Sequence, residues 1–194
     1  DTELLRRSAL FAVRGDNDHQ RGEGAVARYL PRSASGPYAF SWGGVRFLAL
    51  DIWDATGLQS GPPLEATGPQ AQWLAQQLEA PAARQASFRV VFLHEPVYLA
   101  RGRSAEQLRR VLGPLFERGR VDLVFSSWHL YERSQHGGVT YVVSGGGGAP
   151  LVWMPPHPSQ AAQVAALRHH FCRVDVQTGA LTLQAVADDG SVLD

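Results

Sequence analysis

A chain of 194 residues favours one domain over two small ones, and its hydrophobic fraction of 44% is ordinary for a protein that buries a core. The 18 basic and 18 acidic residues cancel, so the composition predicts no binding to nucleic acid and none to an anionic membrane surface. The single cysteine, Cys172, excludes an internal disulfide and a cysteine-based zinc site. No apolar run approaches the roughly 20 residues that span a membrane. We therefore expect a soluble protein, exported if an upstream signal peptide has been removed.

The first half of the chain predicts a strand, a β-hairpin and a helix. Short apolar or alternating runs that stop at turn residues are typical of strands, and two such runs around Gly43-Gly44 predict the hairpin. Good helix formers with an apolar stripe predict the helix, which Pro81 ends. In chain order, the expected elements are a helix end (1–8), a strand (9–13), a loop with a helical turn at 25–29 (20–37), the hairpin (38–42 and 45–52), a loop (55–69) and the helix (69–80).

The second half alternates strands with one further helix. That helix is amphipathic, with Ser104 as its predicted N-cap and Gly119 as its predicted C-cap. In chain order, we expect a strand (88–93), the helix (104–118), a buried strand that starts at Val121, a strand (139–144), a loop (150–160) and a terminal hairpin (168–176 and 181–187).

Strands dominate this pattern, and both clear helices lie in crossover positions between strands. The fold class is therefore α/β with substantial antiparallel β-structure. The chain contains no internal repeat and no linker-like segment, which predicts one domain over residues 1–194.

Polar side chains follow three of the predicted strands. They are residues 16–19 (Asp, Asn, Asp and His), His94, and Ser127 with His129. Each cluster alone is more typical of a turn or of a hydrogen-bonded histidine. Functional groups of open α/β sheets nevertheless collect at the carboxyl ends of strands, and the crossover helix makes the last two clusters neighbours.

Imidazoles and carboxylates brought together in this way are ligand types for Zn, Fe or Mn. Two such ions about 3.5–4 Å apart can activate a water and polarise a phosphoryl oxygen. A Ser–His–Asp hydrolase using Ser126 or Ser127 is the competing hypothesis, and it ranks lower because the chain has no Gly-x-Ser-x-Gly elbow.

The order of these segments resembles the calcineurin-like metallophosphoesterases, in particular their purple acid phosphatase-like branch. The similarity covers almost the whole chain. It runs through Gly-Asp-Asn-Asp at 15–18, Leu-Asp at 50–51, Gln-x-x-Trp-Leu at 70–74, His-x-Pro-x-Tyr at 94–98, Val-Asp-Leu-Val at 121–124, Ser-Ser-x-His-x-Tyr-Glu-Arg at 126–133 and a Gly-rich turn that ends at 148. The resemblance implies a β-sandwich flanked by helices in α-β-β-α layers, and hydrolysis of a phosphate ester by a metal pair of Fe, Zn or Mn.

Residue by residue, the resemblance makes Asp16, His94 and His129 the expected metal ligands. Asp16 stands where the family has a ligand Asn, and Asn17 stands where it has a His that assists the reaction, although an amide cannot donate a proton as His⁺ does. A shifted alignment instead makes Asn17 a ligand and His19 the acid, so we take Asn17 and His19 as the catalytic candidates. The first His of the family's Gly-His-x-His motif is replaced by Ser127.

The family also opens with strands bearing Asp-x-His and Gly-Asp, and nothing before Gly15 matches them. Without these strands we expect an open sheet edge, covered by upstream residues of the native protein or by another chain. We therefore expect a phosphoric ester hydrolase by ancestry, impaired or inactive as this chain, whose metal pair is partial or absent. The alternative is a pseudo-phosphatase that acts as a binding or structural module.

Overall fold

The computed structural model describes residues 7–21, 23–30, 33, 35–52, 64–99, 106–152 and 162–194. The predictions for residues 1–6 and Ser104, and most of those for the loops at 55–69 and 150–160, lie outside these ranges. None of the helices in the described part of the chain is long and apolar enough to cross a membrane.

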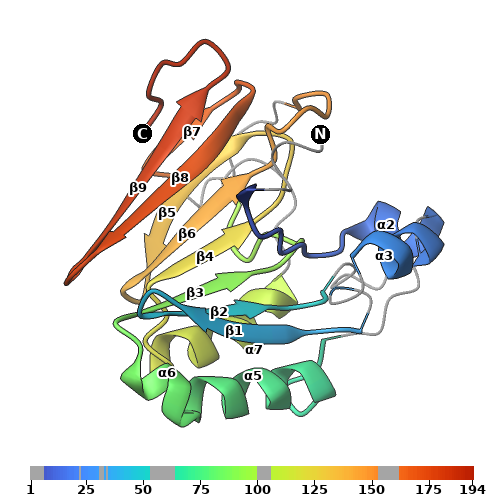
Figure 1. Cartoon of the computed structure of the whole chain (residues 1–194), viewed down its shortest axis with the longest axis vertical. Helices are drawn as coiled ribbons and strands as arrows, with labels where there is room; N and C mark the ends of the chain where they lie inside the picture. Colours follow the sequence, from blue (N-terminus) through green and yellow to red (C-terminus); the bar gives the residue numbers. More distant parts are fainter. Residues whose placement is uncertain are drawn as a thin grey trace.

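A seven-stranded mixed sheet forms the centre of the fold (Figure 1). The strand order is β1-β2-β3-β4-β6-β5-β7, in which β2, β3, β4 and β6 are parallel, and β1, β5 and β7 run antiparallel to their neighbours. The strands are β1 (Tyr38–Trp42), β2 (Val45–Ala49), β3 (Phe88–Phe92), β4 (Leu123–Ser126), β5 (Tyr131–His136), β6 (Val139–Ser144) and β7 (Val164–Ala166). The predicted hairpin is β1–β2, and its Gly-Gly turn takes positive φ at both residues, as such two-residue turns require.

Three helices cover one face of this sheet: α5 (Pro69–Glu79), α6 (Pro81–Gln85) and α7 (Glu106–Arg118). Their apolar stripes and the facing strand residues form one buried core, which includes Leu74, Leu112, Phe116, Val91 and Val124. Two smaller helices, α2 (Asp16–Arg21) and α3 (Glu23–Tyr29), lie beside the sheet (Figure 1). The helix predicted over 69–80 and the helical turn at 25–29 are confirmed.

The end of α7 differs in detail from the prediction. Gly119 follows the helix, but Arg120 is the residue with left-handed backbone (φ 50°), and the amide of Val121 donates to the carbonyl of Phe116 at 2.9 Å. This is the hydrogen-bond pattern of a Schellman cap with Arg120 at the position that favours glycine. Gly119 serves packing instead, because a Cβ there would lie 2.6 Å from Cδ1 of Leu78 on α5.

The other face of the sheet is packed against a second, two-stranded sheet. It is the predicted terminal hairpin, β8 (His170–Gln177) and β9 (Ala180–Ala187), followed by residues 191–194, which pair with β9. The two sheets share an apolar core that includes Val90, Leu123, Val142 and Ala185. The layers of helices, large sheet and small sheet confirm the expected mixed α/β sandwich.

Two predictions about the N-terminal part are wrong. Residues 9–13 are extended but make no strand ladder within the described residues; the carbonyl of Ala12 instead accepts hydrogen bonds from Ser33 Oγ (2.5 Å) and Tyr38 Oη (2.8 Å). The polar cluster after them is helix α2 and not a turn. Asp18 explains the helix start, because its carboxylate accepts a hydrogen bond at 2.8 Å from the amide of Gly15, as in a capping box.

Candidate functional site

The predicted strand ends do lie at one edge of the sheet. The backbone ladder continues past the strands, with the amide of Leu93 bonded to the carbonyl of Phe125 at 3.0 Å and that of Ser127 bonded to the carbonyl of His94 at 2.9 Å. Asp51 follows β2, His94 follows β3, and Ser127 and His129 follow β4. Because these strands are parallel, their carboxyl ends meet at the same edge, as expected.

His94 and Asp16 are in direct contact at this edge. His94 Nε2 lies 3.3 Å from Asp16 Oδ1, with side chains 25% and 32% exposed. Gly15 makes the approach possible, because a Cβ there would come within 2.9 Å of His94 Nδ1. Burial lowers the pKa of His94, and the carboxylates of Asp16 and Asp18 oppose that shift, whereas His129 adds to it. The imidazole is therefore neutral near pH 7.

Asp51 is bound by a guanidinium and an imidazole. Its Oδ1 accepts hydrogen bonds from His19 Nε2 at 2.9 Å and Arg14 Nε at 3.2 Å, while its Oδ2 pairs with Arg14 Nη2. All three side chains are almost buried, at 11–14% exposure. The side chain of Gln70 holds the backbone of Asp51. Its Oε1 accepts a hydrogen bond from the amide of Asp51 at 3.0 Å, and its Nε2 donates to the carbonyl of Asp51 at 2.6 Å. This cluster of Arg14, His19 and Asp51 is called the Asp51 cluster below.

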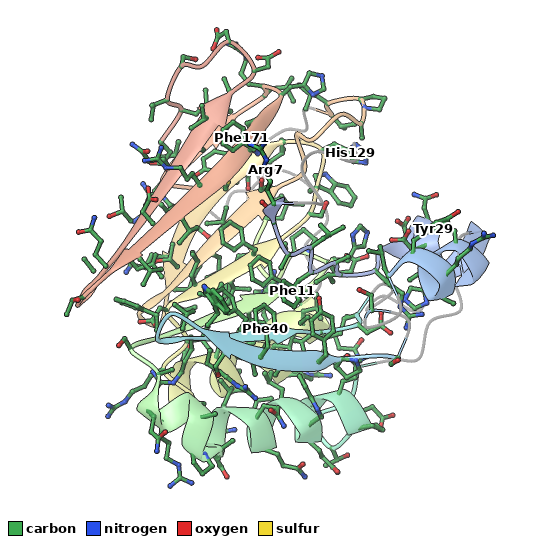
Figure 2. All side chains as sticks on the ribbon, viewed as in Figure 1. Arg7, Phe11, Tyr29, Phe40, His129 and Phe171 are labelled. Carbon is green, nitrogen blue, oxygen red and sulfur yellow. The ribbon has the colours of Figure 1, made fainter. Side chains whose placement is uncertain are left out.

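His129 corresponds to the second histidine of the family's Gly-His-x-His motif, whose first histidine is replaced by Ser127. Its side chain is labelled in Figure 2, and its Nδ1 donates to the carbonyl of Pro150 at 2.8 Å. Its ring lies edge-on to Trp128, with the ring centroids 5.8 Å apart. A backbone carbonyl bound to one ring nitrogen is the usual way to orient an imidazole that ligates a metal through the other. His129 also lies close enough to His94 to contribute to the lowering of its pKa.

The remaining candidates occupy other roles. Ser126 is 8% exposed and donates through Oγ to the carbonyl of Val142 at 3.3 Å, so it does not face the edge as a nucleophile would. The amide of Asn17 donates to Asp16 Oδ1 at 3.3 Å on the exposed first turn of α2. The structure thus places Asn17 and His19 in hydrogen-bonded helix positions.

Tyr131 and Arg133, the last matched residues of the 126–133 motif, bind another part of the chain. Tyr131 is fully buried in β5 and donates to Asp194 Oδ2 at 2.6 Å, and Arg133 binds the same carboxylate through two nitrogens. Burial and the hydrogen bond to Asp194 raise the pKa of Tyr131 far above its usual value. These contacts fasten the chain end onto β5, which is a structural role.

The side chains that the structure describes do not fit a binuclear metal centre. A metal pair needs several carboxylates and imidazoles aimed at common points. Within the described residues no group of three His, Cys, Asp or Glu side chains could hold even one ion. Asp51 is already paired with Arg14 and hydrogen-bonded to His19, and Ser127 offers a hydroxyl where an imidazole is needed.

Sequence reasoning missed the role of Arg14. The available signal was a cation placed directly before the Gly15 turn, and its partner Asp51 stands 37 positions away in the Leu-Asp motif. No local pattern connects the two.

No protein-family model matches the chain, and no curated protein matches it by sequence. Solved structures do. The chain is similar to GAP50, described as the anchor in the inner membrane complex of Plasmodium, with a TM-score of 0.66 and 20% identity over 81% of this chain and 51% of that one. It is also similar to the purple acid phosphatase PPD1 from yellow lupin seeds, with a TM-score of 0.67 and 19% identity over 84% of this chain and 32% of that one.

These similarities show a metallophosphoesterase-like fold, as the sequence motifs had predicted. The chain spans about half the length of GAP50 and about a third of the lupin phosphatase.

Proposed function

We propose that this chain is an impaired member of the metallophosphoesterase superfamily, derived from hydrolases that cleave phosphoric esters with a metal pair but inactive towards such esters by itself. The observation that carries the proposal is the Asp51 cluster. A carboxylate at the candidate edge is bound by a guanidinium and an imidazole, so it is not available to a metal ion.

The charge and the burial of Arg14 both disfavour binding of a metal pair at this edge. Arg14 stays charged at every relevant pH and repels a divalent cation at short range. If Asp51 bound a metal instead, the nearly buried guanidinium of Arg14 would lose its counter-ion. Removing one partner of a fully buried ion pair costs about 3–5 kcal/mol of stability. Asp16 and His94 are in contact, but within the described residues His129 does not complete a group of three ligands with them, and a typical catalytic metal site has three protein ligands.

Metal content and turnover test the proposal together. The purified chain is dialysed extensively after incubation with Zn, Fe or Mn, analysed for metals, and assayed with a chromogenic phosphate ester. We expect far fewer than two ions per chain and no turnover. About two retained ions per chain with ester hydrolysis would overturn the proposal.

A matched variant separates the causes of inactivity. Restoring the family's histidines with Asn17→His and Ser127→His supplies the two lost imidazoles. If only this variant gains metal and activity, the two substitutions explain the impairment. If neither protein is active, the Asp51 cluster or ligands outside this chain are responsible, which Asp51 variants on the same background distinguish.

A second candidate function is a pseudo-phosphatase that acts as a binding or structural module. It is favoured by exposed apolar side chains near β1, where Trp42 is 79%, Leu10 59% and Phe11 45% exposed. GAP50, a protein of similar fold, is described as an anchor. This alternative predicts that partner binding survives Asp16→Ala and His94→Ala, which remove the contact at the sheet edge.

A further inference from the structure

A cavity of about 390 Å³, called the arginine cavity below, lies between the ends of α5 and α7, helix α6 and the start of β3. Four of its lining residues are arginines: Arg84, Arg89, Arg118 and Arg120. Among the residues that line it, Glu79 alone is acidic, so four positive charges and one negative charge leave a net charge of +3. The chain as a whole has a net charge of zero. The cavity therefore concentrates positive charge on an otherwise neutral molecule, an arrangement that attracts anions.

Arg89 reaches the cavity from beneath the helices. Alternate residues of a strand point to opposite faces of the sheet, and Val91, two positions further along β3, is fully buried in the core that the helices cover. Arg89 therefore lies on the helix side of the sheet, where it is half-buried. Its amide donates to Asp122 Oδ2 at 2.7 Å, but within the described residues no carboxylate pairs with its guanidinium. A bound anion would supply a counter-charge that this side chain otherwise lacks.

Arg120 lines the same cavity from a strained position. Its φ of 50° is left-handed, a conformation that is unfavourable for any residue with a Cβ and that helix ends normally assign to glycine. The side chain is exposed, so burial of apolar surface does not explain why an arginine is present. Backbone strain of this kind is concentrated at ligand-binding sites, where the side chain has a use that offsets it. At Arg120 that use is a second guanidinium at the cavity.

The ends of the helices account for only part of this charge. Arg84 Nε donates to the carbonyl of Glu79 at 2.6 Å and so caps α5, and Arg118 lies in the last turn of α7. Each helix C-terminus carries about half a negative charge, so that α5 and α7 together offset about one of the positive charges. About two positive charges remain, and neither helix end needs Arg89 or Arg120 to balance it.

The remaining charge and the apolar lining indicate the class of ligand. A phosphate monoester carries about −1.5 to −2 charges near pH 7, which matches the two positive charges, whereas a sulfonate or a carboxylate carries one. Guanidinium groups bind phosphate oxygens through pairs of parallel hydrogen bonds. Ala75, Leu78 and Leu115 line the same cavity, and they form an apolar surface for an organic group attached to the phosphate.

We propose that the arginine cavity binds a small organic phosphate monoester, with the phosphate held by the guanidinium groups and the organic part against the leucines. The cavity lies at the amino ends of β3 and β4, whereas the candidate metal edge lies at their carboxyl ends. The inference is therefore independent of the chemistry proposed for that edge.

Phenylphosphonate is the probe, because its P–C bond resists phosphatases and its ring supplies an organic group. Calorimetry is done in the presence of EDTA, so that no metal ion at the candidate edge contributes to binding. We expect saturable binding that weakens as salt is added. Inorganic phosphate, which lacks the ring, and benzenesulfonate, which carries one charge, should each bind about tenfold more weakly. Methyl resonances of Leu78 and Leu115 should shift on binding and so locate the ligand.

Three variants of the full chain test the role of the arginines. Arg89→Gln should weaken binding by about tenfold, and Arg120→Gly, which removes a more exposed guanidinium, by about fivefold. The glycine also relieves the left-handed backbone, so a loss of binding in this variant cannot be a loss of fold. Arg110→Gln is the matched control, because Arg110 is an exposed arginine of α7 that does not line the cavity. It should bind as the wild type does.

Several results would overturn the proposal. They are absence of saturable binding, methyl shifts that avoid Leu78 and Leu115, equal losses in Arg110→Gln and Arg120→Gly, and equal binding of phenylphosphonate and inorganic phosphate. A phosphoserine peptide that bound far more tightly than free phosphoserine would also overturn it, because the ligand would then be a phosphorylated polypeptide and not a small molecule.

Discussion

Asp51→Asn tests the Asp51 cluster most directly. The substitution keeps the shape of the side chain but removes the negative charge that pairs with Arg14 and accepts a hydrogen bond from His19. Since the side chains are 11–14% exposed, the guanidinium is left almost buried without its counter-ion. Breaking a buried pair in this way costs about 3–5 kcal/mol, and the residual exposure places the expected loss of unfolding free energy near the lower value, about 3 kcal/mol.

Urea unfolding followed by circular dichroism measures this loss as a lower midpoint at unchanged slope. Asp188→Asn is the matched control, because that carboxylate pairs with Arg168 at an exposed site, with side chains 60% and 44% exposed. It should leave the midpoint unchanged. A double-mutant cycle with Arg14→Gln then isolates the pair, and the double variant should be more stable than the sum of the two losses predicts.

The same experiment can refute the reasoning. If Asp51 were a metal ligand in this chain, added Zn²⁺ would raise the midpoint of the wild-type protein, EDTA would lower it, and Asp51→Asn would remove both effects. We expect the midpoint to be indifferent to both additions. A loss below about 1 kcal/mol in Asp51→Asn would show that the cluster does not hold the edge together.

Three further predictions concern stability. Gly15→Ala should destabilise the fold by about 1–3 kcal/mol in urea unfolding, because its Cβ would press on the ring of His94. Arg120→Gly should raise the thermal midpoint by relieving left-handed backbone worth about 1 kcal/mol. Hydrogen bonds from Arg133 hold the pKa of Asp194 below its usual value. That contribution is therefore complete above the unfolded pKa of about 3.9 and is lost as the pH falls through the lower folded-state pKa. Asp194→Asn should be less stable than wild type at pH 7, and the difference should shrink as the pH falls below about 3.9; a constant difference would contradict this.

The strands that could be predicted from the sequence are those whose formation depends on neighbouring residues in the chain. The β1–β2 hairpin follows from alternating residues around two glycines with positive φ. β5 escaped prediction because Tyr131–His136 is mostly polar, and its burial depends on Asp194, which is 63 positions away. Residues 9–13 have the composition of a strand, yet ladder formation needs a neighbour, which the described residues do not supply.

The candidate site shows the same division. Apolar runs that end in polar residues predicted the position of the sheet edge, and they correctly predicted that His94 and His129 lie there. The pairing of Arg14 with Asp51 could not be predicted from the sequence, because it depends on the position that α2 and the preceding residues 9–13 take against the sheet. That position results from tertiary packing. The motif match includes Tyr131 and Arg133 but does not reveal that both bind Asp194, because a motif locates a residue along the chain and not the direction in which its side chain points.

The strand order β4-β6-β5 has a consequence for how the chain acquires its structure. β5 and β6 are joined by the tight turn of Gly137 and Gly138, whereas β6 must enter between β4 and its own predecessor β5. A local hairpin closes in microseconds, and long-range parallel pairing is slow because loop closure must come first. The β5–β6 hairpin should thus form early and dock as a unit against β4. Pulse-labelling hydrogen exchange would then show amides of β5 and β6 protected together, before those that join β4 to β6.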